Sequence, residues 1–160
     1  MSMLHRRPAG WTFLLALALA LPAAAEYAVT VPTNATWRFL DDGTPPPTNW
    51  ATLDFNHDVW NWAPAPFGGG DLPGTPLAAG HPAYYFRKSV PLAAPDRIGR
   101  LVVRANVDDG VILYWNGVEL LRHNMTNGPV TYTNYASAKA DESQWVEVVV
   151  GDRTALEPSL

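Results

Sequence analysis

The clearest hydrophobic pattern in the chain consists of two short apolar runs, residues 111–115 and 118–123, separated only by Asn116 and Gly117. Both of these residues tolerate the positive φ that a two-residue type I′ turn requires, so the pattern predicts a β-hairpin. The short loop also predicts the register. The expected pairs are Trp115 with Val118, Tyr114 with Glu119, Leu113 with Leu120, Ile112 with Leu121, and Val111 with Arg122.

The two faces of this hairpin differ in polarity. The face that carries Leu113 and Trp115 is nearly all hydrocarbon and is expected to point inward, whereas the face that carries Tyr114 and Glu119 is expected to be partly hydrated.

Most of the remaining chain alternates short strand-forming runs with turns. Residues 56–58 predict a turn, with Asp58 capping a short helical turn that carries Trp60. Residues 63–82 contain five glycines and five prolines and predict one long ordered loop. Helical periodicity is absent after residue 26, which favours an all-β, antiparallel β-sandwich. The expected strands are residues 27–31, 36–40, 83–92, 100–107, 130–135 and 145–150.

The N-terminus has the three parts of a secretory signal peptide. Arg6 and Arg7 precede an apolar run at residues 11–21, and residues 22–25 are small enough for a cleavage site. We expect residues 1–25 to be the signal peptide, cleavage after Ala25, and a secreted or periplasmic location. An uncleaved membrane anchor is the weaker alternative because the apolar run is shorter than the roughly 20 residues that a spanning helix needs. We therefore expect no membrane span after cleavage.

The amino-acid composition limits which binding partners are expected. The 160 residues contain no cysteine, and residues 26–160 carry nine basic and fifteen acidic side chains, a net charge of −6. No basic run is present to neutralise phosphates, so we expect no nucleic-acid partner. Without disulfides, stability must come from core burial or bound ions.

Several short motifs occur in a characteristic order: residues 37–43, Trp50, residues 54–60, 65–68, 84–87 and 109–122. This succession resembles galactose-binding-like jelly-roll domains, which occur as accessory modules of secreted bacterial hydrolases and, more distantly, as the sugar-binding domain of β-galactosidases and β-glucuronidases. The resemblance implies a jelly-roll β-sandwich at residues 26–160. In that family a further strand follows the run that corresponds to residues 145–160, so we expect this domain to be incomplete, truncated at its C-terminus.

The sequence contains no recognisable catalytic arrangement. His57, His81 and His123 lack metal-ligand spacing, and no serine stands in a nucleophile motif. Adjacent carboxylates such as Asp41 and Asp42 point in opposite directions on an extended chain and cannot flank one glycosidic bond. We predict no catalytic residue and no metal or other cofactor, although a structural calcium held by Asp41, Asp108 or Asp109 is a further possibility.

Sugar binding is the function that the resemblance and the aromatic content favour. Tryptophan faces stack on pyranose rings, and a few polar groups fix the orientation. The candidate ligand-binding residues are Trp60, Trp62, Arg87, Tyr114, Glu119 and His123. A burial role for the tryptophans and an ordinary solvated face for the hairpin residues are the competing interpretations.

The sequence thus predicts a non-catalytic, exported β-sandwich module that binds carbohydrate or a cell-surface polymer, or that supports a catalytic domain of a longer parent protein. The alternatives are a fragment of a secreted hydrolase, a phosphoesterase or glycosidase, that contributes to its active site, and a packing domain without a ligand.

Overall fold

The computed structural model describes residues 29–68, 74–92, 99–141 and 145–150. Within these ranges the protein is all-β, as predicted, with one 3-10 turn and no α-helix. The elements are β1 (Thr36–Leu40), the turn η1 (His57–Val59), β2 (Asn61–Pro64), β3 (Phe67–Gly68), β4 (Thr75–Pro76), β5 (Tyr85–Arg87), β6 (Leu101–Asn106), β7 (Val111–Trp115), β8 (Val118–His123) and β9 (Trp145–Val150).

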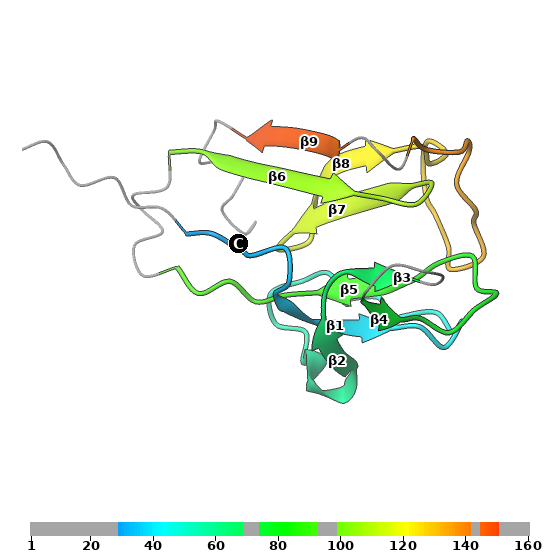
Figure 1. Cartoon of the computed structure of the whole chain (residues 1–160), viewed down its shortest axis with the longest axis horizontal. Coiled ribbons are helices and arrows are strands. Elements are labelled where there is room, and N and C mark those ends of the chain that lie inside the picture. Colours follow the sequence, from blue (N-terminus) through cyan, green and yellow to red (C-terminus); the bar gives the residue numbers. More distant parts are fainter. Residues whose placement is uncertain (1–28, 69–73, 93–98, 142–144, 151–160) are drawn as a thin grey trace, which may run out of the picture.

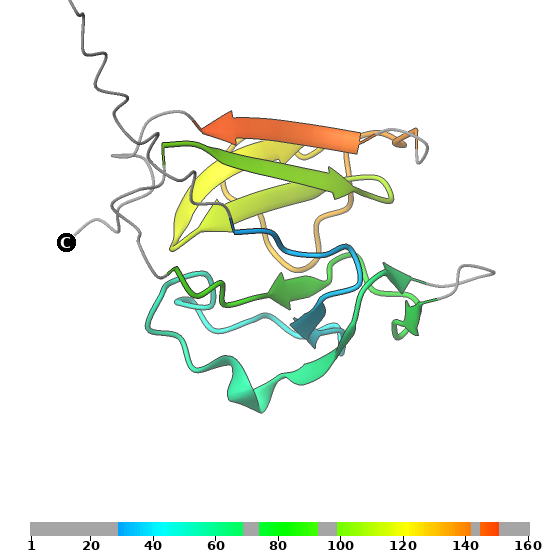
Figure 2. The ribbon, with the colours of Figure 1, turned by 60° about the vertical axis from the view of Figure 1, so that its left-hand side comes forward.

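The strands gather in two groups, with β1–β5 below and β6–β9 above in Figure 1, and the rotated view keeps them apart (Figure 2). The lower group contains the antiparallel sheet β2-β1-β5 and a short parallel ladder of β3 with β4. The upper group contains two antiparallel pairs, β6 with β9 and β7 with β8. The described strands therefore form small sheets that do not close into a barrel.

The central hairpin forms as predicted at its turn. Asn116 has φ 48° and Gly117 has φ 89°, and Trp115 pairs with Val118. Further from the turn the predicted register is wrong. Leu113 lies opposite Leu121 rather than Leu120, because a bulge adds one residue to β8 and shifts the later pairs by one position.

Three predicted strands match the structure closely: β1, β6 and β9. In β6, half-buried positions alternate with exposed ones from Leu101 onward, which is the expected pattern for a strand with one covered face. β5 is shorter than the predicted strand at residues 83–92.

Two other predicted strands are wrong. Residues 29–31, the described part of the run at 27–31, belong to no strand, and neither do residues 130–135. The second run forms a turn instead, in which the Asn134 side chain accepts hydrogen bonds from the backbone N–H and the hydroxyl of Thr131. Asparagine side chains compete with strand ladders in this way.

The loop predicted at residues 63–82 is interrupted by the end of β2 and by β3 and β4. The cap of η1 also differs from the prediction, because the side chain of Asn56, rather than Asp58, accepts the hydrogen bond from the backbone N–H of Asp58. Trp60 follows this turn as its C-terminal cap residue.

Aromatic side chains make up the most deeply buried part of the described chain. Phe39 is 7% exposed and Trp60 is 6% exposed. Phe39 contacts Phe67, with their ring centroids 5.2 Å apart. The Trp50 ring lies 6.2 Å from Trp60 in the lower group and 5.6 Å from Tyr114 of β7, so Trp50 connects the two groups of strands.

No helix in the described part of the chain is long and apolar enough to cross a membrane. The predicted signal peptide at residues 1–25 and the C-terminal residues 151–160 lie outside the described ranges.

Candidate functional site

One face of the sheet β2-β1-β5 carries a row of three large side chains. Arg38 of β1 lies opposite Trp62 of β2 on one side and opposite Arg87 of β5 on the other. Directly opposite residues of neighbouring strands project to the same face. The register therefore brings together two predicted site residues, Trp62 and Arg87, with Arg38 between them.

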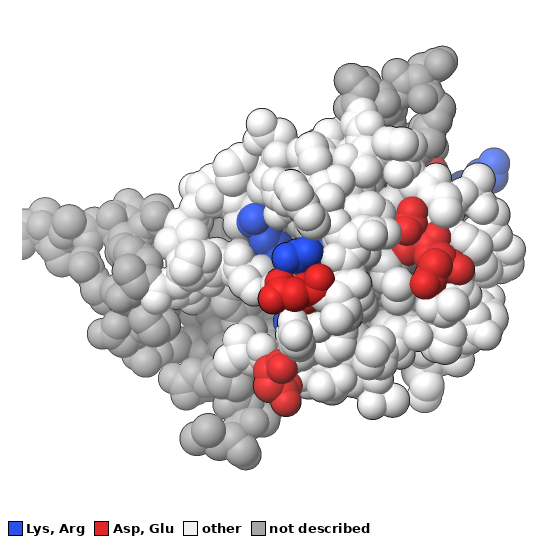
Figure 3. Space-filling view, turned by 90° about the horizontal axis from the view of Figure 1, so that it is seen from below, with Lys and Arg blue, Asp and Glu red and all other residues white. Residues whose placement is uncertain are grey.

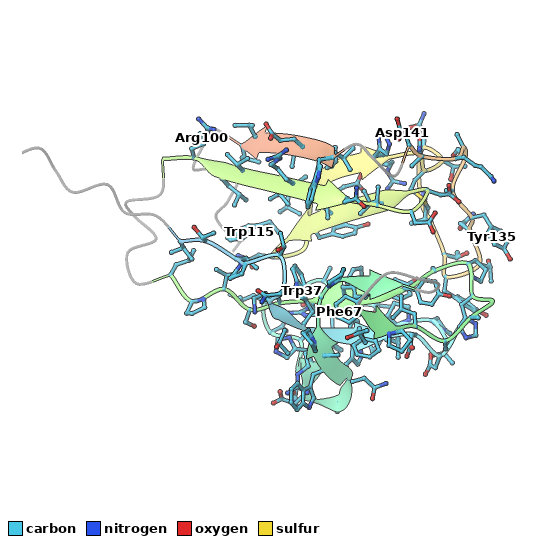
Figure 4. All side chains as sticks on the ribbon, viewed as in Figure 1. Trp37, Phe67, Arg100, Trp115, Tyr135 and Asp141 are labelled. Carbon is cyan, nitrogen blue, oxygen red and sulfur yellow. The ribbon has the colours of Figure 1, made fainter. Side chains whose placement is uncertain are left out.

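Trp62 is the most accessible member of this row. It is 67% exposed, whereas the Arg38 side chain is 29% exposed. A pocket of about 260 Å³ lies beside Trp62 and is also lined by Trp37 and Lys88. Trp37 belongs to the lower group of strands (Figure 4). An open aromatic ring thus borders a hollow lined with basic groups.

Hydrogen bonds hold the two arginines in place. Arg38 donates to the carboxylate of Asp58 at 2.8 Å and to the backbone carbonyl of Trp60 at 3.2 Å. Arg87 donates to the carbonyls of Trp50 and Thr52. Both guanidinium groups therefore have fixed directions, which reduces the entropy lost when they bind a ligand.

Arg87 is also partly covered by aromatic carbon. Its guanidinium carbon lies 5.1 Å from the centroid of the Phe55 ring. Burial lowers the pKa of Arg87, and the negative charge of Asp54 partly opposes this effect. Arginine still keeps its charge at neutral pH because its ordinary pKa is so high.

His57 completes the lining of the pocket from η1. Its Nδ1 atom is buried and has no hydrogen-bond partner among the described residues. Burial lowers the pKa of His57, the positive charges of Arg87 and Arg38 lower it further, and Asp58 acts in the opposite direction. Burial is thus the main cause of the lowered pKa of His57, and Arg87 makes the largest contribution from charge.

The other predicted site residues lie elsewhere. Trp60 is packed against Trp50 and against Phe55, whose ring centroid is 5.4 Å away, so its faces are not open to a ligand. His123 lines a second pocket, also of about 260 Å³, together with Trp145 and Lys139.

Tyr114 and Glu119 face each other across the hairpin but have different partners. Burial raises the pKa of Tyr114, whose ring packs on Trp50. Glu119 forms a two-point ion pair with Arg122, at 2.6 and 2.8 Å, and these hydrogen bonds lower the pKa of Glu119. Trp50 brings Arg87 and Tyr114 into one neighbourhood, since it contacts both.

No family model, curated protein or solved structure significantly matches this chain. The geometry of the described residues therefore has to support any functional argument.

Two of the three acidic residues considered for calcium, Asp41 and Asp109, have structural partners. Asp41 accepts a hydrogen bond from the backbone N–H of Ala78, and Asp109 accepts one from that of Ala140. Asp109 itself has φ 63° in the turn between β6 and β7. Across the described ranges, no group of three or more histidine, aspartate or glutamate side chains could hold a metal ion.

Sequence reasoning missed Trp37, Arg38, Lys88 and Asp58 as site residues. Alternation along β1 indicates only that Arg38 shares a face of the strand with Thr36 and Leu40. It does not indicate that Arg38 lies opposite Arg87, because that pairing joins strands far apart in the chain. Only the sheet register could reveal this part of the site.

Proposed function

We propose that this protein is a non-catalytic, exported module of the galactose-binding-like jelly-roll type, and that it binds a carbohydrate polymer at the Trp62 face of the sheet β2-β1-β5. The signal-peptide pattern at residues 1–25 supports export. The order of short motifs described above and the all-β architecture support the fold proposal.

The observation that carries the binding proposal is the exposure of Trp62 beside the fixed pair of Arg38 and Asp58. A tryptophan indole offers a large flat surface to the C–H groups of a sugar ring. Arg38 offers N–H donors and Asp58, 72% exposed, offers acceptor oxygens for sugar hydroxyls. A binding site for a small polar ligand requires only a few polar groups of this kind, provided that they are held in fixed directions.

The test is affinity electrophoresis of the purified protein in gels that contain a panel of neutral and acidic polysaccharides. We expect at least one polymer to retard the protein, and we expect Trp62→Ala to weaken its binding about tenfold or more, as loss of a central aromatic anchor does. The Trp62→Ala variant should stay folded, because this side chain is 67% exposed.

Trp145→Ala is the matched control. Trp145 is 48% exposed and lies on β9 in the other group of strands, where it contacts Arg104. Its loss should leave binding unchanged. Failure of every polysaccharide to retard the wild-type protein would overturn the proposed function. Equal losses in both variants would show that the loss is not specific to Trp62 and would overturn the assignment of the binding surface to it.

A further inference from the structure

Building on the proposed function, we infer that the ligand is an acidic polysaccharide whose carboxylate or sulfate groups are bound by a basic pocket, formed by Arg38, Arg87 and Lys88, beside Trp62. These three residues line the 260 Å³ pocket, and no carboxylate is among the residues that line it. A neutral sugar does not require such a concentration of positive charge, whereas an anionic one does.

The sheet register places two of these charges side by side. Arg38 and Arg87 are directly opposite each other on β1 and β5. Like charges in this position destabilise a sheet unless something offsets them. Lys88 follows Arg87 in the chain and adds a third positive charge at the same pocket.

Acidic side chains among the described residues neutralise the positive charge of this pocket only in part. Asp58 forms an ion pair with Arg38 at 2.8 Å. Arg87 and Lys88 donate hydrogen bonds to neutral backbone carbonyls instead, Lys88 to that of Thr36 at 2.9 Å. Asp54 acts on Arg87 through its charge, and no ion pair of Arg87 or Lys88 is found among the described residues. Positive charge therefore remains for a ligand to neutralise.

His57 lies on the wall of the same pocket and is subject to this charge. Burial is the main cause that lowers its pKa, the charges of Arg87 and Arg38 lower it further, and the charge of Asp58 opposes them.

The local charge also contrasts with that of the chain as a whole. The protein has 15 acidic and 11 basic residues, so its net negative charge disfavours non-specific attraction of an acidic polymer. The face seen in Figure 3 is largely uncharged, and basic side chains gather near its centre beside an acidic patch, while other acidic patches and a further basic side chain lie apart from them. An acidic polymer would therefore bind through a local basic site such as this pocket, where Trp62 supplies the stacking surface.

The experiment compares three polymers with the purified protein: polygalacturonate, which carries carboxylates, dextran sulfate, which carries sulfates, and neutral dextran. We expect at least one acidic polymer to bind about tenfold or more tightly than dextran at 50 mM NaCl. We expect its affinity to fall at 200 mM NaCl, because salt screens the ion pairs. The acidic polymer that binds more tightly identifies whether carboxylate or sulfate is preferred.

Lys88→Gln is the test variant, since Lys88 makes a single described hydrogen bond and its loss should leave the fold intact. We expect it to weaken binding of the acidic polymer about tenfold, the effect of losing one charge-assisted hydrogen bond. Arg104→Gln is the control. Arg104 is a 59% exposed side chain on β6 whose ion pair with Glu147 lies in the other group of strands.

The outcomes separate this inference from the proposed function. Equal binding of dextran and both acidic polymers, lost in Trp62→Ala, would overturn the acidic ligand and leave carbohydrate binding in place. Binding to none of the polysaccharides would overturn both. Equal effects of Lys88→Gln and Arg104→Gln would show general charge attraction and would also overturn the inference.

Discussion

Trp60 and Trp62 stand two positions apart and have opposite environments. Side chains two apart on a strand project to the same face, which would give a pair of stacked platforms. Trp60, however, is the cap residue of η1, and β2 begins only at Asn61. Trp60 is therefore buried against Trp50 and Phe55, whereas Trp62 is left exposed beside Arg38.

His57 should make stability depend on pH. Its pKa in the folded protein lies below the ordinary value of 6.5, so the unfolded chain binds the proton more readily. The stability that comes from neutral His57 is complete above pH 6.5 and is lost as the pH falls below that value. We expect the urea midpoint of the wild-type protein to fall between pH 7.5 and 5.5 by more than that of His57→Gln. Parallel pH profiles of the two proteins would contradict this prediction.

The carboxylates act in a different range of pH. Hydrogen bonds from Thr44 lower the pKa of Asp42, and those from Arg122 lower the pKa of Glu119. Stability from these groups is present above their ordinary values of 3.8 and 4.5 and is lost below them. A comparison of His57→Gln with wild type between pH 7.5 and 5.5 therefore measures the effect of His57 protonation on stability without a contribution from these carboxylates.

The hairpin β7-β8 is the element whose local sequence most clearly determines its turn. Asn116 and Gly117 both have positive φ, as the type I′ turn requires. The bulge in β8 was not predicted, because no local signal requires an extra residue there. Its effect is to place Leu121, rather than Leu120, opposite Leu113 while both leucines remain half-buried.

Gly117→Ala tests the turn. Gly117 has φ 89°, and an added Cβ would lie 3.5 Å from the nearest atom of Thr52, which is ordinary contact. Gly117→Ala should therefore lower the free energy of unfolding by about 1–2 kcal/mol, because alanine is strained at this φ. The loss should appear as a lower urea midpoint. Gly99→Ala is the control, because its added Cβ meets no atom within 4 Å and its φ is not in the left-handed region. Equal stability of the two variants would contradict this origin of the cost.

At the scale of the whole molecule, an aromatic contact through Trp50 links the two groups of strands. Trp50, from the segment between β1 and η1, contacts Tyr85 below it at 5.1 Å and Tyr114 of the upper group at 5.6 Å. By contrast, Tyr135, 70% exposed, projects from the edge of the molecule (Figure 4). Among the described residues, Trp50 is the aromatic side chain that has ring partners in both groups of strands.

A double-mutant cycle measures this connection. We expect Trp50→Leu and Tyr114→Leu, each measured by urea unfolding, to show a coupling free energy of about 0.5–1.5 kcal/mol, the usual range for an aromatic pair. Trp50→Leu combined with Tyr135→Leu is the control cycle and should be additive. Additivity in both cycles would contradict a direct energetic link between the groups through this pair.

The sequence alone determined the features that depend on neighbours in the chain. These are the all-β class, the Asn116–Gly117 turn and the alternation along β6, since backbone preference and side-chain period are local properties. Local pattern was insufficient at residues 130–135, where the Asn134 side chain replaces a strand ladder with a turn.

Tertiary structure alone decided which distant residues meet. The pairing of β1 with β5 places Arg38 opposite Arg87, and the start of β2 after η1 exposes Trp62 while burying Trp60. Residues far apart in the chain come together only when the strands pair, and a shift of one residue would turn each side chain to the other face. The candidate site therefore depends on sheet register, which no single segment of the sequence encodes.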